Sequence, residues 1–170
     1  VPYRILVPEG IPAIMSAHIA YPEILGNPLP ASRSEYLIEE VLRKKLGFQG
    51  VLITDDMEMN GAISGGVDTA QASLEALQAG NDMILVSHTS SAQERTWQQL
   101  AEFAAGDPEF RQRLKRSVRR ILAVKLAYLK SDAEAEPKSP EAVPGPIPSA
   151  GAWEFFQQSA LRSVTLIRDR

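Results

Sequence analysis

The sequence alternates short apolar runs with longer amphipathic stretches, and only a few residues separate one from the next. Three apolar runs have the length and character of buried strands, at residues 12–17, 51–54 and 83–86. Helical periodicity follows at residues 32–46, 69–79, 91–105 and 107–130. Strands that alternate with helices form parallel sheets, because a parallel pair needs a long crossover connection. The order therefore predicts an α/β fold built from βαβ units.

Local residue signals indicate where several of these helices begin. Ser32 and Glu35 have the spacing of a capping box, in which each side chain binds the other residue's backbone N–H. Asp68 has the position and residue type of an N-cap for the helix that follows it. Asp107 precedes Pro108, which is the preferred order for an N-cap and the first helical residue.

The chain divides by composition into three parts, at residues 1–130, 131–149 and 150–170. The middle part holds five prolines and four acidic residues and too little apolar surface to fold, so we expect a stiff linker. Beyond it, residues 153–161 predict a helix and residues 163–167 a strand, which we interpret as the start of a second domain. Three strands are too few to close a barrel, so we do not expect residues 1–130 to form a complete catalytic domain.

Composition excludes several kinds of site and partner. The chain has no cysteine, which excludes disulfides, thiolate nucleophiles and cysteine-based metal sites. The net charge of -3 gives no reason to expect nucleic acid or a membrane as partner, and we place the charges of the basic run at 111–120 on the solvated face of a helix. No signal peptide is visible, but the chain begins with Val1, so a cytoplasmic or secreted location and the oligomeric state stay open.

Polar side chains follow each predicted strand. Ligands of parallel α/β proteins bind at the carboxyl ends of the strands, so these side chains are the first candidates for a site. They are Ser16 and His18 after the first strand, Asp55 and Asp56 after the second, and Ser87 and His88 after the third.

The two adjacent aspartates cannot both serve one site. Alternation along the strand places Asp55 on the side of Val51 and Ile53, and Asp56 on the other side. A carboxylate beside apolar neighbours is costly unless it is paired or used, although either aspartate could instead cap the following loop. Asp55, Asp56 and Glu58 could also offer oxygen ligands to Mg²⁺ or Ca²⁺, but adjacent strand residues diverge, so we expect no metal and no other cofactor.

Other candidate residues have simpler interpretations beside the functional ones. His18 and His88 could be hydrogen-bonded structural histidines rather than catalytic groups. Glu58 reads as a solvated loop residue. Met59 could pack beneath the loop or contact a ligand.

Four segments then resemble a known family in the same order. They are IPAIMSAHIAYP, EEVLRKKLGFQGVLITDDMEMNGA, ALQAGNDMILVSH and RLKRSVRRILAVKL, and together they resemble glycoside hydrolase family 3, closest to its β-N-acetylhexosaminidase branch. The resemblance spans residues 11–129, and SALRSVTLIRDR near the end resembles the entry into that family's α/β-sandwich domain. It implies that residues 1–130 form the C-terminal part, with the last three βα units, of a TIM-like (β/α)8 barrel.

The resemblance also implies roles for individual residues. The family's nucleophile follows Ser or Thr at the end of the penultimate strand, a pattern that matches Thr54 and Asp55 and so selects Asp55 over Asp56. His18 matches a position that lines the sugar pocket, and with Met59 it is our predicted substrate contact. The family's Lys-His-Phe-x-Gly-His loop and its Asp–His acid/base pair lie upstream of these motifs, and neither is in this sequence.

The predicted function is retaining exo-hydrolysis of terminal β-linked N-acetylglucosamine through a glycosyl-aspartate intermediate, in cell-wall recycling by resemblance. One alternative is a β-glucosidase or β-xylosidase of the same family, which the DDMEM spelling disfavours. A glycoside phosphorylase of that family stays open as well, since water and phosphate could compete for one intermediate. Another class of alternative is a non-catalytic carbohydrate-binding or interaction module. Because the acid/base residue is missing, we expect residues 1–170 alone to be inactive.

Overall fold

A computed structural model describes residues 2–129 and 151–163. The chain separates into two compact units, Val1–Lys130 and Ser131–Arg170, which are described here one at a time. The helices and strands are α1 (Pro2–Leu6), β1 (Ala13–Ser16), α2 (Pro22–Leu25), the 3₁₀ turn η1 (Ala31–Arg33), the π-helix η2 (Tyr36–Lys45), β2 (Val51–Asp56), α3 (Thr69–Ala79), β3 (Met83–Leu85), α4 (Ser90–Gly106), α5 (Pro108–Tyr128) and α7 (Ala152–Ser163).

The three strands form a parallel sheet in the order β1-β2-β3, which confirms the predicted α/β class. Met15 pairs with Ile53, and Ile53 pairs with Met83, so these three side chains share one face. The register between β2 and β3 is irregular between Ile53 and Asp56. Both aspartates lie within β2, two residues beyond the predicted end of this strand.

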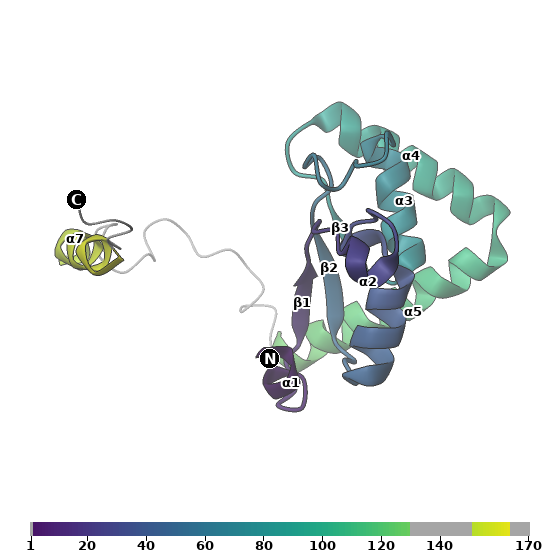
Figure 1. Cartoon of the computed structure of the whole chain (residues 1–170). Coiled ribbons are helices and arrows are strands. Elements are labelled where there is room, and N and C mark those ends of the chain that lie inside the picture. Colours follow the sequence, from purple (N-terminus) through teal and green to yellow (C-terminus); the bar gives the residue numbers. More distant parts are fainter. Residues whose placement is uncertain (1, 130–150, 164–170) are drawn as a thin grey trace. The chain divides into compact units, whose positions relative to one another are not determined.

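The two faces of the sheet have different surroundings. Ile14 and Leu52 point to one face and pack against Ile38, Phe48 and Ala79 in a buried cluster. The helices α3 and α4 lie to one side of the strands, and α5 runs back across the lower end of the strands, near α1 (Figure 1). Phe103 and Phe110 meet edge to face between α4 and α5, with ring centroids 5.1 Å apart.

The opposite face is open within the described residues. Met15 is 51% exposed and Met83 is 39% exposed, and both are apolar strand residues at paired positions. A parallel sheet normally has both faces covered, because its strands are apolar on both sides. The open face is therefore the one on which this sheet lacks a packing partner among residues 2–129.

The predicted N-caps have different outcomes. Asp68 accepts a hydrogen bond from Gln71 N at 2.8 Å, and Asp107 accepts from Phe110 N at 2.9 Å, which confirms both caps. The predicted capping box is wrong, because the Ser32 hydroxyl binds His18 instead. The helix begins only at Tyr36, and its hydrogen bonding is of the π type.

The expectation for the basic run is wrong at two positions. Arg113 is buried and donates to Asn81 O at 2.6 Å and to Ser117 Oγ at 2.9 Å, while Arg120 donates to Asp82 Oδ1 at 3.0 Å. These positions lie on one helical face at a spacing of three or four residues, so the inward side of α5 carries polar groups as well as the apolar Phe110 and Leu114. The apolar positions Val118 and Leu122 are instead about half exposed.

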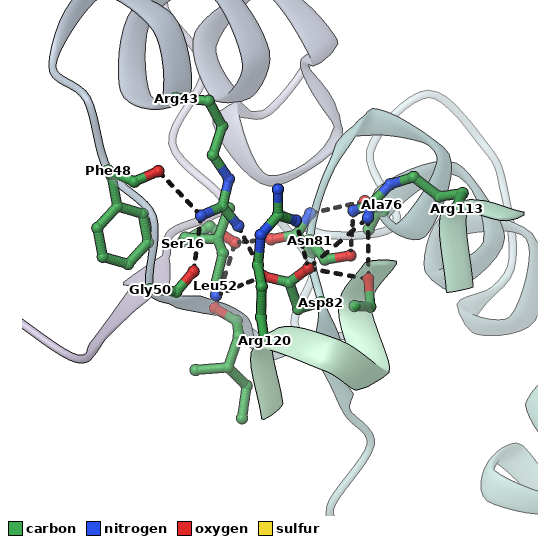
Figure 2. Close-up of polar contacts among 12 residues, drawn as sticks. Ser16, Arg43, Phe48, Gly50, Leu52, Ala76, Asn81, Asp82, Arg113 and Arg120 are labelled. Carbon is green, nitrogen blue, oxygen red and sulfur yellow. Dashed lines mark hydrogen bonds and ion pairs between the residues drawn. The ribbon is translucent and has the colours of Figure 1, made fainter. Parts of the chain in front are cut away.

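The buried arginines converge on Asp82, the residue before β3 (Figure 2). Arg43 of η2 donates to Asp82 Oδ2 at 2.6 Å, and Leu52 N donates to the same oxygen at 3.0 Å. Ser117 Oγ donates to Asp82 Oδ1 at 2.8 Å. This Asp82 cluster, made of Asp82, Arg43, Ser117, Arg113 and Arg120, ties η2, β2 and α5 together at the start of β3.

The second unit contributes one described element. The predicted helix at 153–161 is confirmed as α7, which spans Ala152–Ser163. The predicted linker at 131–149 and strand residues 164–167 lie outside the described residues. Among the residues described, no helix has both the length and the apolar character needed to cross a membrane.

Candidate functional site

The structure brings the ends of all three strands together around Asp56. His18 Nε2 lies 3.0 Å from Asp56 O, and Ser87 Oγ donates to Asp56 Oδ2 at 2.5 Å. His88 Nδ1 lies 2.5 Å from the same carboxylate oxygen. Residues from β1, β2 and β3 that are far apart in the sequence thus share one polar cluster.

Ser16 does not join this cluster. It shares the helix-facing side of β1 with Ile14, and its hydroxyl donates to Asn81 Oδ1 at 2.6 Å. Asn81 is buried and donates in turn to Ser32 O and Ala76 O, each at 2.7 Å. Ser16 is therefore part of the contact between the sheet and the helices.

Asp55 lies at the end of β2 on the open face of the sheet. Two residues after Ile53, its side chain shares the face of Ile53 and Met15. It is half-buried, and its Oδ1 accepts a hydrogen bond from the backbone N–H of Asp56 at 2.8 Å. Among residues 2–129 and 151–163, no hydrogen bond reaches Asp55 Oδ2. One carboxylate oxygen is thus held while the other is available.

Asp56 is buried and almost fully hydrogen-bonded. Its Oδ1 accepts from Glu58 N at 3.1 Å and from Ser87 N at 3.4 Å, and its Oδ2 accepts from the Ser87 hydroxyl. Burial by itself raises the pKa of Asp56, but the Ser87 hydroxyl, the N–H groups of Glu58 and Ser87 and the charge of His88 outweigh it and hold the pKa below its ordinary value. Asp56 is therefore an anion that fastens the end of β2 to the segment after β3.

His18 is held by protein groups at both ring nitrogens. Its Nδ1 lies 2.7 Å from Ser32 Oγ, and its Nε2 must carry the proton because the carbonyl of Asp56 can only accept. Gly61 approaches this residue so closely that a Cβ there would lie 2.8 Å from His18 O. Gly61 thus allows the loop after β2 to pack directly on His18.

Arg33 holds the loop after β2 by hydrogen bonds to its backbone carbonyls. Its guanidinium donates to Ala62 O at 2.9 Å and to Ser64 O at 2.8 Å, and it pairs with Glu75 of α3 at 2.5 Å. Arg33 is 8% exposed, and the sequence alone gave no sign that it would be buried. Gly61 carried a weak signal, since a glycine in a loop can mark a close approach.

Two further residues of this loop differ in exposure. Met59 is 47% exposed in the turn after β2 and can meet a ligand from the solvent side. The expectation that Glu58 is simply solvated is wrong, because its Oε2 accepts from His88 N at 2.7 Å and from Thr89 N at 3.0 Å. Backbone N–H groups before a helix lack intrahelical partners, which explains why a carboxylate is favoured there.

One group of side chains at the site has the composition of a metal site. Asp56, Glu58 and His88 each place one potential ligand atom within 4.8 Å of the others. This set differs from the predicted one, since it contains His88 in place of Asp55. The carboxylate oxygens in it already accept hydrogen bonds from N–H and hydroxyl donors, so the protein itself satisfies them.

Comparison with known proteins gives a consistent result. Residues 1–124 match the glycosyl hydrolase family 3 N-terminal domain. A β-hexosaminidase of Idiomarina loihiensis is 38% identical over 122 residues, which are 72% of this chain and 36% of the relative. A family 3 β-N-acetylglucosaminidase structure from Paenibacillus sp. has a TM-score of 0.74 and 31% identity over 99% of this chain and 31% of its own. A β-glucoside phosphorylase structure has a TM-score of 0.72 and 26% identity over 98% of this chain and 31% of its own. The chain thus spans about a third of the length of these relatives.

Proposed function

Because the chain belongs to glycoside hydrolase family 3, we propose that it forms the nucleophile-bearing part of a β-N-acetylhexosaminidase. In this proposal β1, β2 and β3 are the last three strands of a TIM-like barrel. The parallel order of the strands and the helices on one face support this assignment. The exposed apolar side chains of Met15 and Met83 are then the interior of a barrel that further strands complete.

Asp55 is the proposed nucleophile, and the observation that carries this is its position. It is the strand-end carboxylate on the open face, held through Oδ1 by the Asp56 N–H. In a retaining mechanism, Asp55 Oδ2 attacks the anomeric carbon while the bond to the leaving oxygen breaks, and that oxygen takes a proton from an acid/base group outside this chain. Water then attacks the glycosyl-aspartate ester, gives a proton to the same group and frees the carboxylate.

Trapping of the intermediate tests this assignment in the protein that contains the whole catalytic domain. A 2-fluoro glycoside with a good leaving group should label the peptide that contains Asp55. Asp55→Asn should lower kcat by several orders of magnitude, and azide should restore turnover because a small anion can replace the missing carboxylate. Asp68→Asn is the matched control, since asparagine keeps the N-cap and Asp68 is exposed. A label on any other peptide would remove Asp55 from this role.

The substrate contacts in this proposal are His18 and Met59. Since both ring nitrogens of His18 have protein partners, its contact with the sugar is through the ring carbons. The exposed thioether of Met59 then packs on an apolar face of the sugar. Met59→Ala should raise KM by a few fold with kcat nearly unchanged, and an equal loss in kcat would contradict a pure binding role.

The similarity to a β-glucoside phosphorylase supports a second candidate, in which phosphate replaces water in the second step. A panel of nitrophenyl glycosides, assayed with and without inorganic phosphate, separates the two functions. Preference for the N-acetylglucosaminide with no effect of phosphate supports hydrolysis. Preference for the glucoside together with a sugar phosphate product would establish the second candidate instead.

A further inference from the structure

The backbone of Asp56 contacts both Asp55, the candidate nucleophile, and His18. Its N–H donates to Asp55 Oδ1 at 2.8 Å, and its carbonyl accepts from His18 Nε2 at 3.0 Å. The direction of the Asp55 carboxylate therefore depends on how the peptide between Asp55 and Asp56 is oriented. The orientation of His18 depends on the next peptide, which carries the Asp56 carbonyl.

The sheet does not hold these peptides in the regular way. The ladder between β2 and β3 loses its register between Ile53 and Asp56, and Leu85 N donates to the Thr54 hydroxyl at 3.1 Å. Such irregularities re-aim side chains next to functional sites, but they also remove ladder hydrogen bonds. The ladder bond from Met57 N to Leu85 O, at 2.9 Å, remains beside this irregularity, and a side-chain interaction adds to it.

The Asp56 side chain supplies that interaction. Asp56 is 5% exposed, and its carboxylate is anchored to Ser87 by the hydroxyl at 2.5 Å and by the backbone N–H at 3.4 Å. His88 and the Glu58 N–H complete its shell, at 2.5 Å and 3.1 Å. The Asp56 side chain thus joins the end of β2 to the segment after β3, beside the contacts that Glu58 makes with His88 N and Thr89 N.

We propose that Asp56 is a positioning residue, which aims the Asp55 carboxylate through the Asp56 N–H because Ser87 and His88 anchor its own side chain. This inference rests on the proposed role of Asp55. Asp56 does not touch the reacting atoms, and its effect on the reaction is transmitted by one peptide group. A misplacement of a reacting group by about 1 Å can lower a rate by about 100-fold, so the anchor has a measurable effect.

Asp56→Asn in the protein with the whole catalytic domain is the first test. Asparagine has the same shape, but it has one acceptor oxygen in place of two. Its NH₂ group cannot accept the hydrogen bonds that a carboxylate oxygen accepts from its partners. We expect kcat and the rate of labelling by the 2-fluoro glycoside to fall by about 10- to 100-fold, with KM within about threefold, at temperatures well below Tm. Azide should not restore this variant, because its nucleophile is present.

Ser87 provides the second test, because it is exposed, and we expect its replacement to leave the fold intact, which the Tm of each variant checks. Ser87→Ala should lower kcat by about 3- to 10-fold, and Ser87→Thr, which keeps the hydroxyl, should restore it. Asp68→Asn is the matched carboxylate control and should keep wild-type kinetics. Activity should also be unchanged by EDTA, since a loss on chelation would make the Asp56, Glu58 and His88 group a metal site instead.

The outcomes separate the two proposals. If the label falls on Asp55 and Asp56→Asn keeps kcat within twofold, the positioning role is overturned while the nucleophile stands. If kcat falls only in proportion to a lost folded fraction, or if Ser87→Thr is as impaired as Ser87→Ala, Asp56 is purely structural. A label on another carboxylate overturns the proposed function itself.

Discussion

Two aspartates at opposite ends of the sheet show two different uses of a buried carboxylate. Asp82 precedes β3 and pairs with three arginines, Arg43, Arg113 and Arg120, at 2.6 Å, 3.6 Å and 3.0 Å. Asp56 ends β2 and is held by a hydroxyl, backbone N–H groups and one exposed histidine. The ion-pair partners of Asp82 are three guanidinium groups, whereas the hydrogen bonds that Asp56 accepts come from a hydroxyl and from backbone N–H groups.

The difference follows the two ends of a parallel α/β sheet. In (β/α)8 barrels the amino ends of the strands serve stability and the carboxyl ends carry the chemistry, and our proposal assigns the two ends of this sheet in the same way. Burial raises the pKa of Asp82, but the Leu52 N–H, the charge of Arg43 and the hydrogen bonds from Ser117 and Arg120 outweigh it and hold the pKa below its usual value. The Asp82 cluster thus fixes the scaffold on which the Asp56 cluster is arranged.

The largest expected effect comes from removing Asp82. Asp82→Ala leaves the buried Arg43 and Arg113 and the partly buried Arg120 without their counter-charge and should lower the free energy of unfolding by about 3–5 kcal/mol. Asp56→Asn should cost only about 1–2 kcal/mol, because it breaks hydrogen bonds at the edge of the fold. Urea unfolding of the two variants measures the difference. Equal losses of stability would show that the two ends of the sheet are not specialised in this way.

Two arginines of α5 test, within a single helix, how much a buried charged group adds to stability compared with an exposed one. Arg113 is buried and bound to Asn81 O and Ser117, whereas Arg116 is exposed. Arg113→Met should lower the free energy of unfolding by about 2–3 kcal/mol, since it removes charged hydrogen bonds to buried groups. Arg116→Met should stay within about 0.5 kcal/mol. A similar small effect for both would mean that the polar groups on the inward side of α5 add little to stability.

Gly61 tests the contact between the loop and His18 at the carboxyl end. Gly61→Ala would place a Cβ 2.8 Å from His18 O and 3.0 Å from His18 Cβ, so one of the two segments must move. We expect a loss of about 1–2 kcal/mol in unfolding free energy and a rise in KM. Gly106→Ala is the control, because a Cβ there meets nothing within 4 Å. An unchanged KM in Gly61→Ala would contradict the proposal that His18 contacts the substrate.

The smallest expected effect is a pH dependence of stability. Both Asp56 and Asp82 have a lowered pKa in the folded protein, so their contributions are complete above the unfolded value of about 3.9 and are lost as the pH falls through the folded values. Tm should therefore fall between about pH 4 and pH 2, and less steeply in Asp82→Asn. A Tm that rose on acidification in this range would contradict the assigned directions.

The sequence was sufficient where the signals were local. The strand and helix order, the caps at Asp68 and Asp107 and the family resemblance are confirmed, because alternation, capping residues and contiguous motifs depend on near neighbours. The pairing of Ser32 with Glu35 failed because Ser32 has a stronger partner, His18, which lies in the preceding loop. The role of Asp55 stays a prediction that its position at the end of β2 supports.

By itself, the sequence determined the α/β order and directed attention to the pair Asp55 and Asp56. Only the tertiary structure decided that Arg33, Arg43 and Arg113 are buried, because each reaches acceptors that the fold brings near from other elements. It also decided that Asp56 binds Ser87, 31 residues away, while its N–H holds Asp55. Alternation can place two adjacent carboxylates on opposite faces, but the partners that each face offers are set by packing between distant segments.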